Sequence, residues 1–175
     1  MKRAKNAAVI GVLAAVYSVT ALAVIPFPAM PLSLQCFAVA LGSCVFGFKV
    51  GLWATAVYVV MGAVGLPVFA GMRGGIGVLF GATGGFVWGF FIIALLCGST
   101  SNKGKPYSLL SGVAALVFAY GAGICQYAFV TGTYAFSAIS AVFLPLFVKD
   151  VLLIFAAVPL SALIKKELNK SKTRY

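Results

Sequence analysis

Histidine is absent from this 175-residue sequence, and acidic residues are nearly absent, with two Asp and Glu in total. Histidine is a common general base and the commonest metal ligand in proteins, so the chain lacks the group on which much acid–base and metal chemistry depends. The four cysteines lie in apolar segments, with no histidine to complete a familiar metal set: Cys36, Cys44, Cys97 and Cys125. We therefore expect no enzyme activity, no metal site and no cofactor.

A phosphate-binding loop is also missing. Segment 98–106, GSTSNKGKP, comes near the Walker A pattern, but it has one residue too many before Gly-Lys and Pro106 where serine or threonine is needed. The chain is therefore not expected to hydrolyse ATP. Recognition of a small molecule is the kind of function that remains.

Charge is scarce overall, at 9% of residues, while 63% of residues are hydrophobic. A soluble domain needs more charge on its surface, so the composition indicates an all-α polytopic membrane protein in contact with membrane lipid. The net charge of +11 could suggest a nucleic-acid partner. However, the basic residues flank apolar runs and form no basic face with interleaved aromatic residues, so we expect no nucleic-acid binding.

Apolar runs bounded by proline, glycine or charge predict six transmembrane helices in a single domain, 1–175. Their approximate spans are 7–25, 32–48, 50–66, 77–97, 107–130 and 140–164. The second and third spans are short for a hydrocarbon core of about 30 Å.

The basic residues follow the positive-inside rule if both termini are cytoplasmic. That side would hold eleven of the thirteen Lys and Arg residues: Lys2, Arg3, Lys5, Lys49, Lys103, Lys105, Lys165, Lys166, Lys170, Lys172 and Arg174. Glu167 lies in the same basic tail and is expected to be a solvated partner of Lys165 or Lys170. Arg73 and Lys149 would face the other side of the membrane.

Asp150 is the carboxylate that the membrane should disfavour. It lies 14 residues before Ile164, where the sixth span ends, which is about 21 Å of helix. The hydrocarbon core needs about 30 Å, so the span should begin near residues 140–145 and Asp150 should lie below the outer surface. Its helical neighbours three and four positions away are apolar, and Lys149 is expected to point about 100° around the helix, so its own helix is expected to offer no partner.

Two interpretations of Asp150 and Arg73 stay open. They could form a structural ion pair, or both could line an outward-facing binding pocket, because an ionisable residue inside a membrane usually faces a partner charge, a cavity or a ligand. With Lys149 the charges sum to a formal +1, which suits a monoanion. The carboxylate would then accept hydrogen bonds from N–H groups of the ligand.

Arg73 lies among glycines. Pro67, Gly71, Gly74 and Gly75 predict an irregular, partly re-entrant loop, which is tolerated at depth only where it is buried in protein or lines a cavity. After it, glycines at four-residue spacing predict one helix face that a neighbouring helix or a ligand approaches closely: Gly77, Gly81, Gly85 and Gly89. The same spacing of small residues in the first helix could form a docking face for another membrane subunit: Ala7, Gly11 and Ala15.

Residues 65–85, GLPVFAGMRGGIGVLFGATGG, resemble the BioY family, the biotin-specific substrate-capture (S) components of energy-coupling factor transporters. The family pattern reads approximately GLPVFAGG-x-GG-x-G-x-L-x-GPTGGY. Segment 31–35, PLSLQ, is similar to the family sequence at the start of the second helix, and segment 144–150, LPLFVKD, to the aspartate-bearing start of the sixth. Departures from the pattern are Ala82, Phe86, Lys149 and Leu153, the last standing where the family often has lysine.

The resemblance implies a six-helix S-component fold in the bacterial cell (inner) membrane, with biotin as the transported substrate. It implies that Asp150 accepts from the ureido group with Gln35 as an amide partner, and that Arg73 binds the valerate carboxylate with help from Lys149. Tyr58 and Gln126 are weaker candidates for the same site. It also implies that Ala7, Gly11 and Ala15 contact a membrane coupling subunit, which acts with two cytoplasmic ATPases.

Three alternatives remain. The chain could be an S component for another vitamin, although the match over 65–85 argues against this. It could be a solitary biotin carrier that needs no ATPase partners. It could also be a structural membrane subunit in which Asp150 and Arg73 merely join two helices.

Overall fold

The protein is described by a computed structural model for residues 2–25, 32–134 and 136–173, so Pro31 of the PLSLQ segment and Arg174 of the basic tail lie outside the described residues. Helices make up nearly all of the described chain. In order, the elements are α1 (Lys2–Leu22), β1 (Val24–Ile25), β2 (Leu32–Ser33), α2 (Gln35–Phe46), α3 (Phe48–Ala63), α4 (Ile76–Phe80), α5 (Gly84–Ser99), α6 (Lys105–Thr131) and α7 (Phe136–Thr173).

The first helix ends earlier than the sequence predicts, at Leu22 rather than residue 25. Val24 and Ile25 instead pair antiparallel with Ser33 and Leu32 as a short ribbon. Two features account for the change: residues before a proline, here Pro26, disfavour helix, and β-branched side chains favour extended backbone. This ribbon was not expected, and it leads directly into α2.

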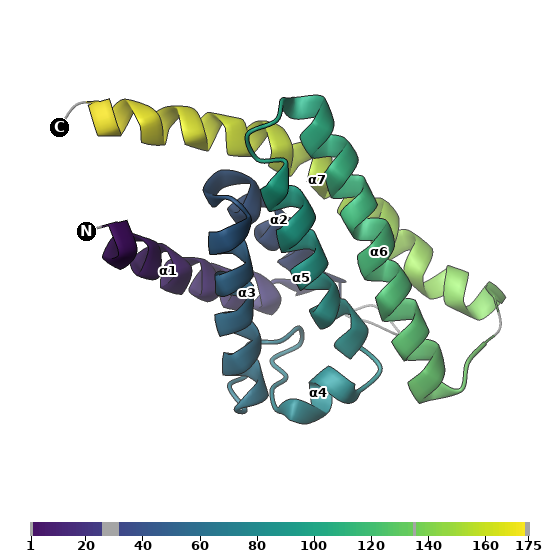
Figure 1. The fold of residues 1–175 in the computed structure, drawn as a ribbon. Coiled ribbons are helices and arrows are strands. Elements are labelled where there is room, and N and C mark those ends of the chain that lie inside the picture. The colour runs from purple at the N-terminus through teal and green to yellow at the C-terminus, as the bar shows by residue number, and fades with distance from the viewer. Residues whose placement is uncertain (1, 26–31, 135, 174–175) are drawn as a thin grey trace.

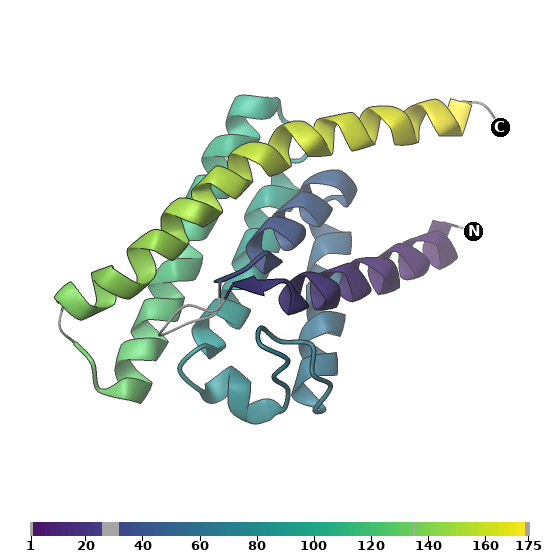
Figure 2. The same ribbon diagram turned by 180° about the vertical axis from the view of Figure 1, so that it is seen from behind.

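The last helix is longer than predicted, running over 38 residues from Phe136 to Thr173 instead of 140–164. Pro145 and Pro159 lie inside it. A proline removes a backbone hydrogen bond and bends a helix, and Figure 2 shows α7 changing direction along its length. The C-terminal part of α7 therefore projects away from the body, as α1 does, and both termini lie on the same side of the molecule (Figure 1).

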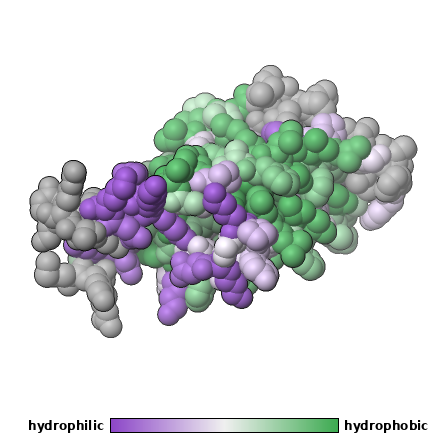
Figure 3. Space-filling model, turned by 90° about the horizontal axis from the view of Figure 1, so that it is seen from above, coloured by the Kyte–Doolittle hydropathy of each residue, from purple (hydrophilic) through white to green (hydrophobic). Residues whose placement is uncertain are grey.

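Among the described residues, three helices are long and apolar enough to cross a membrane, over Ala4–Leu22, Lys105–Thr131 and Phe143–Lys170. Three shorter apolar helices, α2, α3 and α5, lie between the first two of these along the chain. Figure 3 shows apolar residues over most of the visible surface, with hydrophilic residues gathered toward the side to which α7 projects. In the C-terminal part of α7, Nζ of Lys170 forms an ion pair of 2.8 Å with Glu167. Lys170 is one of the two partners that the sequence predicts for Glu167.

The connections gather at two ends of the helix cluster. Figure 1 shows the α3–α4 loop, α4 and the α6–α7 connection at its lower end, and the α2–α3 junction and the α5–α6 loop at its upper end. Lys49, Lys103 and Lys105 are therefore at the opposite end from Arg73. This separation agrees with the sides that the charge pattern predicts.

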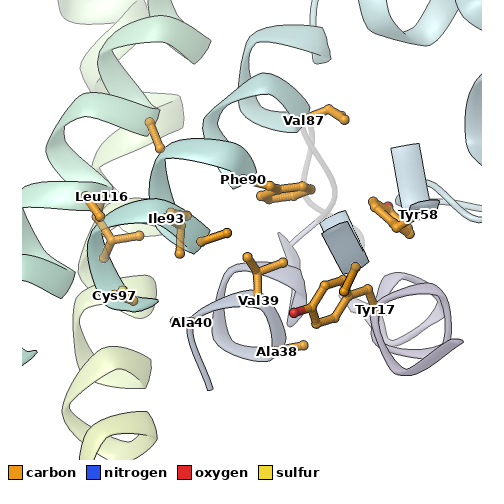
Figure 4. Close-up of a cluster of buried hydrophobic side chains, with 14 of the residues drawn as sticks. Tyr17, Ala38, Val39, Ala40, Tyr58, Val87, Phe90, Ile93, Cys97 and Leu116 are labelled. Atoms are coloured by element: carbon orange, nitrogen blue, oxygen red, sulfur yellow. The ribbon is translucent and has the colours of Figure 1, made fainter. Parts of the chain in front are cut away.

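The core lies where α2 packs between α1, α3 and α5. Val39, Ala54, Tyr58 and Ile93 are fully buried there. Figure 4 shows this cluster running from Leu116 and Cys97 on one side, through Ile93, Val39 and Phe90, to Tyr17 and Tyr58 on the other. The aromatic rings at this second side form a rigid wall, because Tyr58 contacts Tyr17 and Phe69 edge to face, at 6.2 and 5.6 Å between ring centroids.

The expected single helix over 77–97 is wrong, because the helix breaks between Phe80 and Gly84. Gly81 has extended backbone, with φ −79° and ψ −177°. Two carbonyl oxygens at the break, those of Leu79 and Gly81, accept hydrogen bonds of 2.8 Å each from Nε2 of Gln126. The same oxygens also accept from Nε1 of Trp88 and from the backbone N–H of Gly84, respectively. The break turns the short α4 away from α5.

The four glycines at four-residue spacing therefore do not share a helix face. A methyl group at Gly77 would meet no atom within 4 Å, so this glycine is not a packing position. At Gly85 a methyl group would lie 2.5 Å from the carbonyl oxygen of Ala122, and at Gly89 it would lie 2.7 Å from Cβ of Ala119. Close approach between α5 and α6 accounts for these last two glycines.

Gly85→Ala should destabilise the protein, because the added methyl group would overlap the backbone of α6. Overpacking of this kind costs about 1–3 kcal/mol, so the Tm of the purified protein in detergent should fall by several degrees. Gly77→Ala adds the same methyl group in open space and serves as the matched control, with an unchanged Tm. Equal losses for the two variants would contradict the packing assigned to α5 and α6.

Candidate binding site

A cavity lies between the β-ribbon, α2, the α3–α4 loop and the facing sides of α4 to α7. About 610 Å³ of empty space lies inside it and at its open mouth together. Its walls are formed by Ser33, Gln35, Cys36, Phe69, Ala70, Arg73, Val78, Thr83, Phe86, Val87, Phe90, Tyr120, Leu146, Lys149 and Asp150. Four of the six predicted ligand-binding residues are in this set: Asp150, Arg73, Gln35 and Lys149.

Asp150 lines the cavity and is almost completely buried, with 3% of its surface exposed. Its Oδ2 accepts a hydrogen bond of 2.7 Å from the hydroxyl of Tyr120 on α6. Its Oδ1 lies 2.8 Å from Nζ of Lys149. The expectation that its own helix offers no partner is therefore wrong, because the flexible four-carbon stem of the adjacent lysine reaches around the helix.

Lys149 makes a second contact that joins α7 to the β-ribbon. Its Nζ donates to the carbonyl oxygen of Ser33 at 2.6 Å, and its side chain is 26% exposed. The charge of Lys149 is thus compensated by Asp150, and its position is fixed by two elements. Lys149 acts first as the partner of the buried carboxylate.

Arg73 is at the rim of the cavity, on the irregular α3–α4 loop. Its backbone pairs with that of Phe69 in both directions, with N···O distances of 2.9 and 3.3 Å. Its Nε donates to the carbonyl oxygen of Ala70 at 3.2 Å, and the side chain is exposed. Within the described part of the chain Arg73 forms no ion pair with Asp150, so the structural ion pair considered above is not what joins these elements.

The glycines of this loop have the role that the sequence predicts. Gly71 and Gly75 have φ of +74° and +94°, in the left-handed region that favours glycine. Gly74 lies against the chain, since a methyl group there would be 2.3 Å from the carbonyl oxygen of Leu66. The loop therefore folds back tightly on the end of α3 and carries Arg73 on its outer turn.

Gln35 lies on the cavity wall, whereas Tyr58 lies behind it and does not line the cavity. Gln35 accepts from the Ser33 hydroxyl at 2.9 Å through Oε1, and its Nε2 donates to the hydroxyl of Tyr58. That hydroxyl in turn donates to the carbonyl oxygen of Val68 at 3.1 Å. Tyr58 thus holds other groups in place and is too deeply buried to touch a ligand in the cavity.

Gln126 is not part of the cavity wall either, because its side chain is occupied with the backbone at the α4–α5 break. Ala7, Gly11 and Ala15 lie apart from the cavity on α1. All three are exposed, and a methyl group at Gly11 would meet no atom within 4 Å. The small-residue face of α1 is therefore open to a partner.

Sequence reasoning missed three polar residues of the site, Tyr120, Ser33 and Thr83, and Tyr120 is the one that bonds Asp150. Tyr120 is 5% exposed and packs edge to face against Phe86 and Phe147, at 5.2 and 5.3 Å between centroids. A tyrosine in the middle of an apolar helix carries a hydroxyl that needs a partner. That is the signal that could have found it, although the sequence alone does not identify the partner as Asp150.

The cavity combines polar groups of two kinds with apolar walls. Asp150 and Gln35 can accept hydrogen bonds, while Arg73 provides a cation whose terminal nitrogens make no bond within the described residues. Its other walls are aromatic and aliphatic, including Phe69, Phe86 and Phe90. Such a site suits a ligand with N–H groups, an apolar body and an anionic group.

The chain is similar in sequence to known biotin transporters. The biotin transporter BioY of Thermotoga maritima is 38% identical over 161 residues, covering 89% of this chain and 93% of that protein. A probable biotin transporter BioY of Lysinibacillus sphaericus is 32% identical over 168 residues, covering 92% and 85%. The chain therefore spans nearly the full length of both relatives.

The fold matches a crystal structure of the S-component for biotin from an ECF-type ABC transporter, with a TM-score of 0.77 over 91% of this chain and 92% of that one. Sequence identity to it is 20%, so this likeness concerns the fold. The sequence profile of the BioY family matches residues 1–170. With its long apolar helices and these transporter relatives, the chain is an integral membrane protein, and it belongs to the BioY family.

Proposed function

We propose that this chain is the substrate-capture component of a biotin uptake system and that biotin binds in the cavity between Asp150 and Arg73. One observation carries the proposal: a buried carboxylate and an exposed arginine line one cavity whose other walls are largely apolar. The names of the relatives and the family membership support biotin as the substrate.

The chemistry of biotin fits the groups that line the cavity. Its ureido ring is neutral and offers two N–H donors and one carbonyl acceptor. Each oxygen of Asp150 has two lone pairs, so Oδ2 can accept a ligand N–H while keeping its hydrogen bond from Tyr120, and Oδ1 can do so while keeping its ion pair with Lys149. Gln35 uses one amide N–H on Tyr58 and retains the other, which suits the ureido carbonyl.

The rest of biotin fits the apolar walls and Arg73. The thioether ring and the methylene chain of biotin are apolar and would pack against Phe86, Phe90 and Leu146. This packing removes apolar surface from water, which favours binding. The valerate carboxylate would reach Arg73, since the charge of Lys149 is already compensated by Asp150. The binding of a monoanion thus follows from the cation that stays available.

Transport against a gradient would require partners, because the chain has no Walker A loop. We propose that the exposed face of Ala7, Gly11 and Ala15 contacts a membrane coupling subunit, which acts with two cytoplasmic ATPases. In this arrangement the chain has six membrane segments and cytoplasmic termini in the bacterial inner membrane. The cavity would then face outward, and α1 would be the contact with the energy-coupling module.

Asp150→Asn and Arg73→Gln should affect two ligands differently. Asp150→Asn replaces one acceptor oxygen by a donor, and a hydrogen bond to a charged group contributes about 1.5–3 kcal/mol, so biotin and its neutral amide should both bind at least roughly tenfold more weakly. Arg73→Gln should weaken biotin much more than the amide, because only the carboxylate needs the cation. Equilibrium binding to the purified variants measures all four combinations.

The same four measurements separate a pocket from a scaffold. If Asp150 and Arg73 only hold helices together, both substitutions would lower the Tm and would weaken both ligands equally. Lipoate, riboflavin and thiamine serve as competing ligands, and tighter binding of any of them than of biotin would assign the site to another vitamin.

Bulky substitutions on α1 should separate capture from uptake. Ala7→Leu, Gly11→Leu and Ala15→Leu add side chains on an exposed face away from the cavity, so biotin binding should be unchanged while uptake with an ATPase module falls. Uptake into cells expressing the chain with its coupling partners gives the measurement. Loss of binding in these variants would show that the face is internal packing, and full uptake in cells without coupling subunits would favour a solitary carrier.

The proposed orientation predicts which loops are accessible from outside intact cells. In a variant whose native cysteines are replaced by alanine, a cysteine at Met72 should react with a membrane-impermeant maleimide, whereas a cysteine at Asn102 should react only after lysis. Both positions are exposed, so accessibility rather than burial decides the result. The reverse labelling pattern would overturn the topology.

A further inference from the structure

The charged residues that line the cavity are on different parts of the chain. Asp150 and Lys149 lie on α7, while Arg73 lies on the loop between α3 and α4. The Arg73 side chain is held only within its own loop among the described contacts, through the carbonyl oxygen of Ala70. Whether Arg73 points correctly for a ligand held at Asp150 therefore depends on how that loop is fixed to the rest of the site.

A continuous series of contacts connects α7, which carries Asp150 and Lys149, to the α3–α4 loop, which carries Arg73. Lys149 binds the carbonyl oxygen of Ser33, and the Ser33 hydroxyl donates to Gln35. Gln35 donates to the hydroxyl of Tyr58, and Tyr58 donates to the carbonyl oxygen of Val68. We call this series the Ser33–Gln35–Tyr58 chain.

Tyr58 reaches the Arg73 loop in two ways. Its hydroxyl holds the backbone of Val68, and its ring contacts that of Phe69 edge to face at 5.6 Å. Phe69 is the residue whose backbone pairs with that of Arg73 in both directions, and its ring lies directly over Gly62 of α3. Gln35 and Tyr58 are 4% and 0% exposed, so water does not compete for these bonds.

We propose that Tyr58 is a positioning residue that sets the orientation of Arg73 relative to Asp150. This proposal rests on the proposed function, because it assumes that Arg73 binds the ligand carboxylate. The ring of Tyr58 supplies packing, whereas its hydroxyl transmits the position of β2 and Gln35 to the loop. Removing the hydroxyl alone should therefore loosen the carboxylate end without unfolding the core.

Tyr58→Phe tests this with a ratio of affinities, Kd for the neutral biotin amide divided by Kd for biotin. A general loss of affinity, or a loss at the ureido end, lowers binding of both ligands and cancels in the ratio. Misplacement of Arg73 weakens the binding of biotin, which has a carboxylate, and leaves the binding of the neutral amide unchanged. We expect the ratio to fall at least about fivefold in Tyr58→Phe, in the range of measured coupling between linked sites. In an Arg73→Gln background, adding Tyr58→Phe should leave the ratio unchanged.

Tyr17→Phe is the matched control. Tyr17 is equally buried and packs edge to face on Tyr58, but its hydroxyl lies outside the Ser33–Gln35–Tyr58 chain. It should leave the ratio unchanged. If Tyr58→Phe weakens biotin and its amide equally, or if Tyr17→Phe lowers the ratio as much, the positioning role is overturned.

Two further measurements keep the test decisive. Gln35→Met interrupts the chain one contact earlier and leaves the Tyr58 hydroxyl in place, so it should lower the ratio in the same direction if Tyr58→Phe does not fold. Hydrogen–deuterium exchange of residues 64–75 should rise in Tyr58→Phe and not in Tyr17→Phe. If the unmodified chain does not distinguish biotin from the amide, the carboxylate role of Arg73 fails, and exchange alone then decides whether Tyr58 fixes the loop.

Discussion

The buried carboxylate of Asp150 is the constraint on which the binding site depends. A charge removed from water costs several kcal/mol unless hydrogen bonds and an opposite charge compensate it. Here Tyr120 and Lys149 do so, one on each oxygen, and Lys149 is held at the same time by the backbone of Ser33. These contacts bring α6, α7 and the β-ribbon to one place. The cavity forms between these elements and the side of α5 that carries Phe86 and Phe90.

Compensation of Asp150 determines what the rest of the site can bind. Because Lys149 is paired, the formal +1 charge of the cavity is carried by Arg73, whose side chain is exposed. A ligand with an anionic group and hydrogen-bond donors meets a complementary group for each. A buried carboxylate and an exposed cation thus favour one direction of binding, with the donors inward and the anionic group outward.

The sequence predicts the charges of the site better than their partners. Asp150 and Arg73 stand out because charge is rare in this chain, and Gly71, Gly74 and Gly75 identify the irregular loop. The pairing with Lys149 was missed because ideal helical spacing describes Cβ directions and not the reach of a long side chain. The helix break at Gly81 was missed because a glycine repeat fits both a packed helix face and a turn. Tyr120 depends on where α6 lies, which no spacing within one helix reveals.

Tyr58 and Gln126 explain why polar residues in so apolar a chain are hard to assign from sequence. Both were predicted to touch the ligand, and both instead bond backbone carbonyls of the irregular segment around Arg73: Val68 for one, and Leu79 and Gly81 for the other. Non-helical backbone that is shielded from water needs such partners, because its carbonyls have no regular helix bonds. An irregular loop that carries a binding residue therefore requires polar side chains for its own backbone. In a chain with few polar residues, some lie near the site because they hold its loop, and whether a side chain lines the cavity distinguishes the two groups.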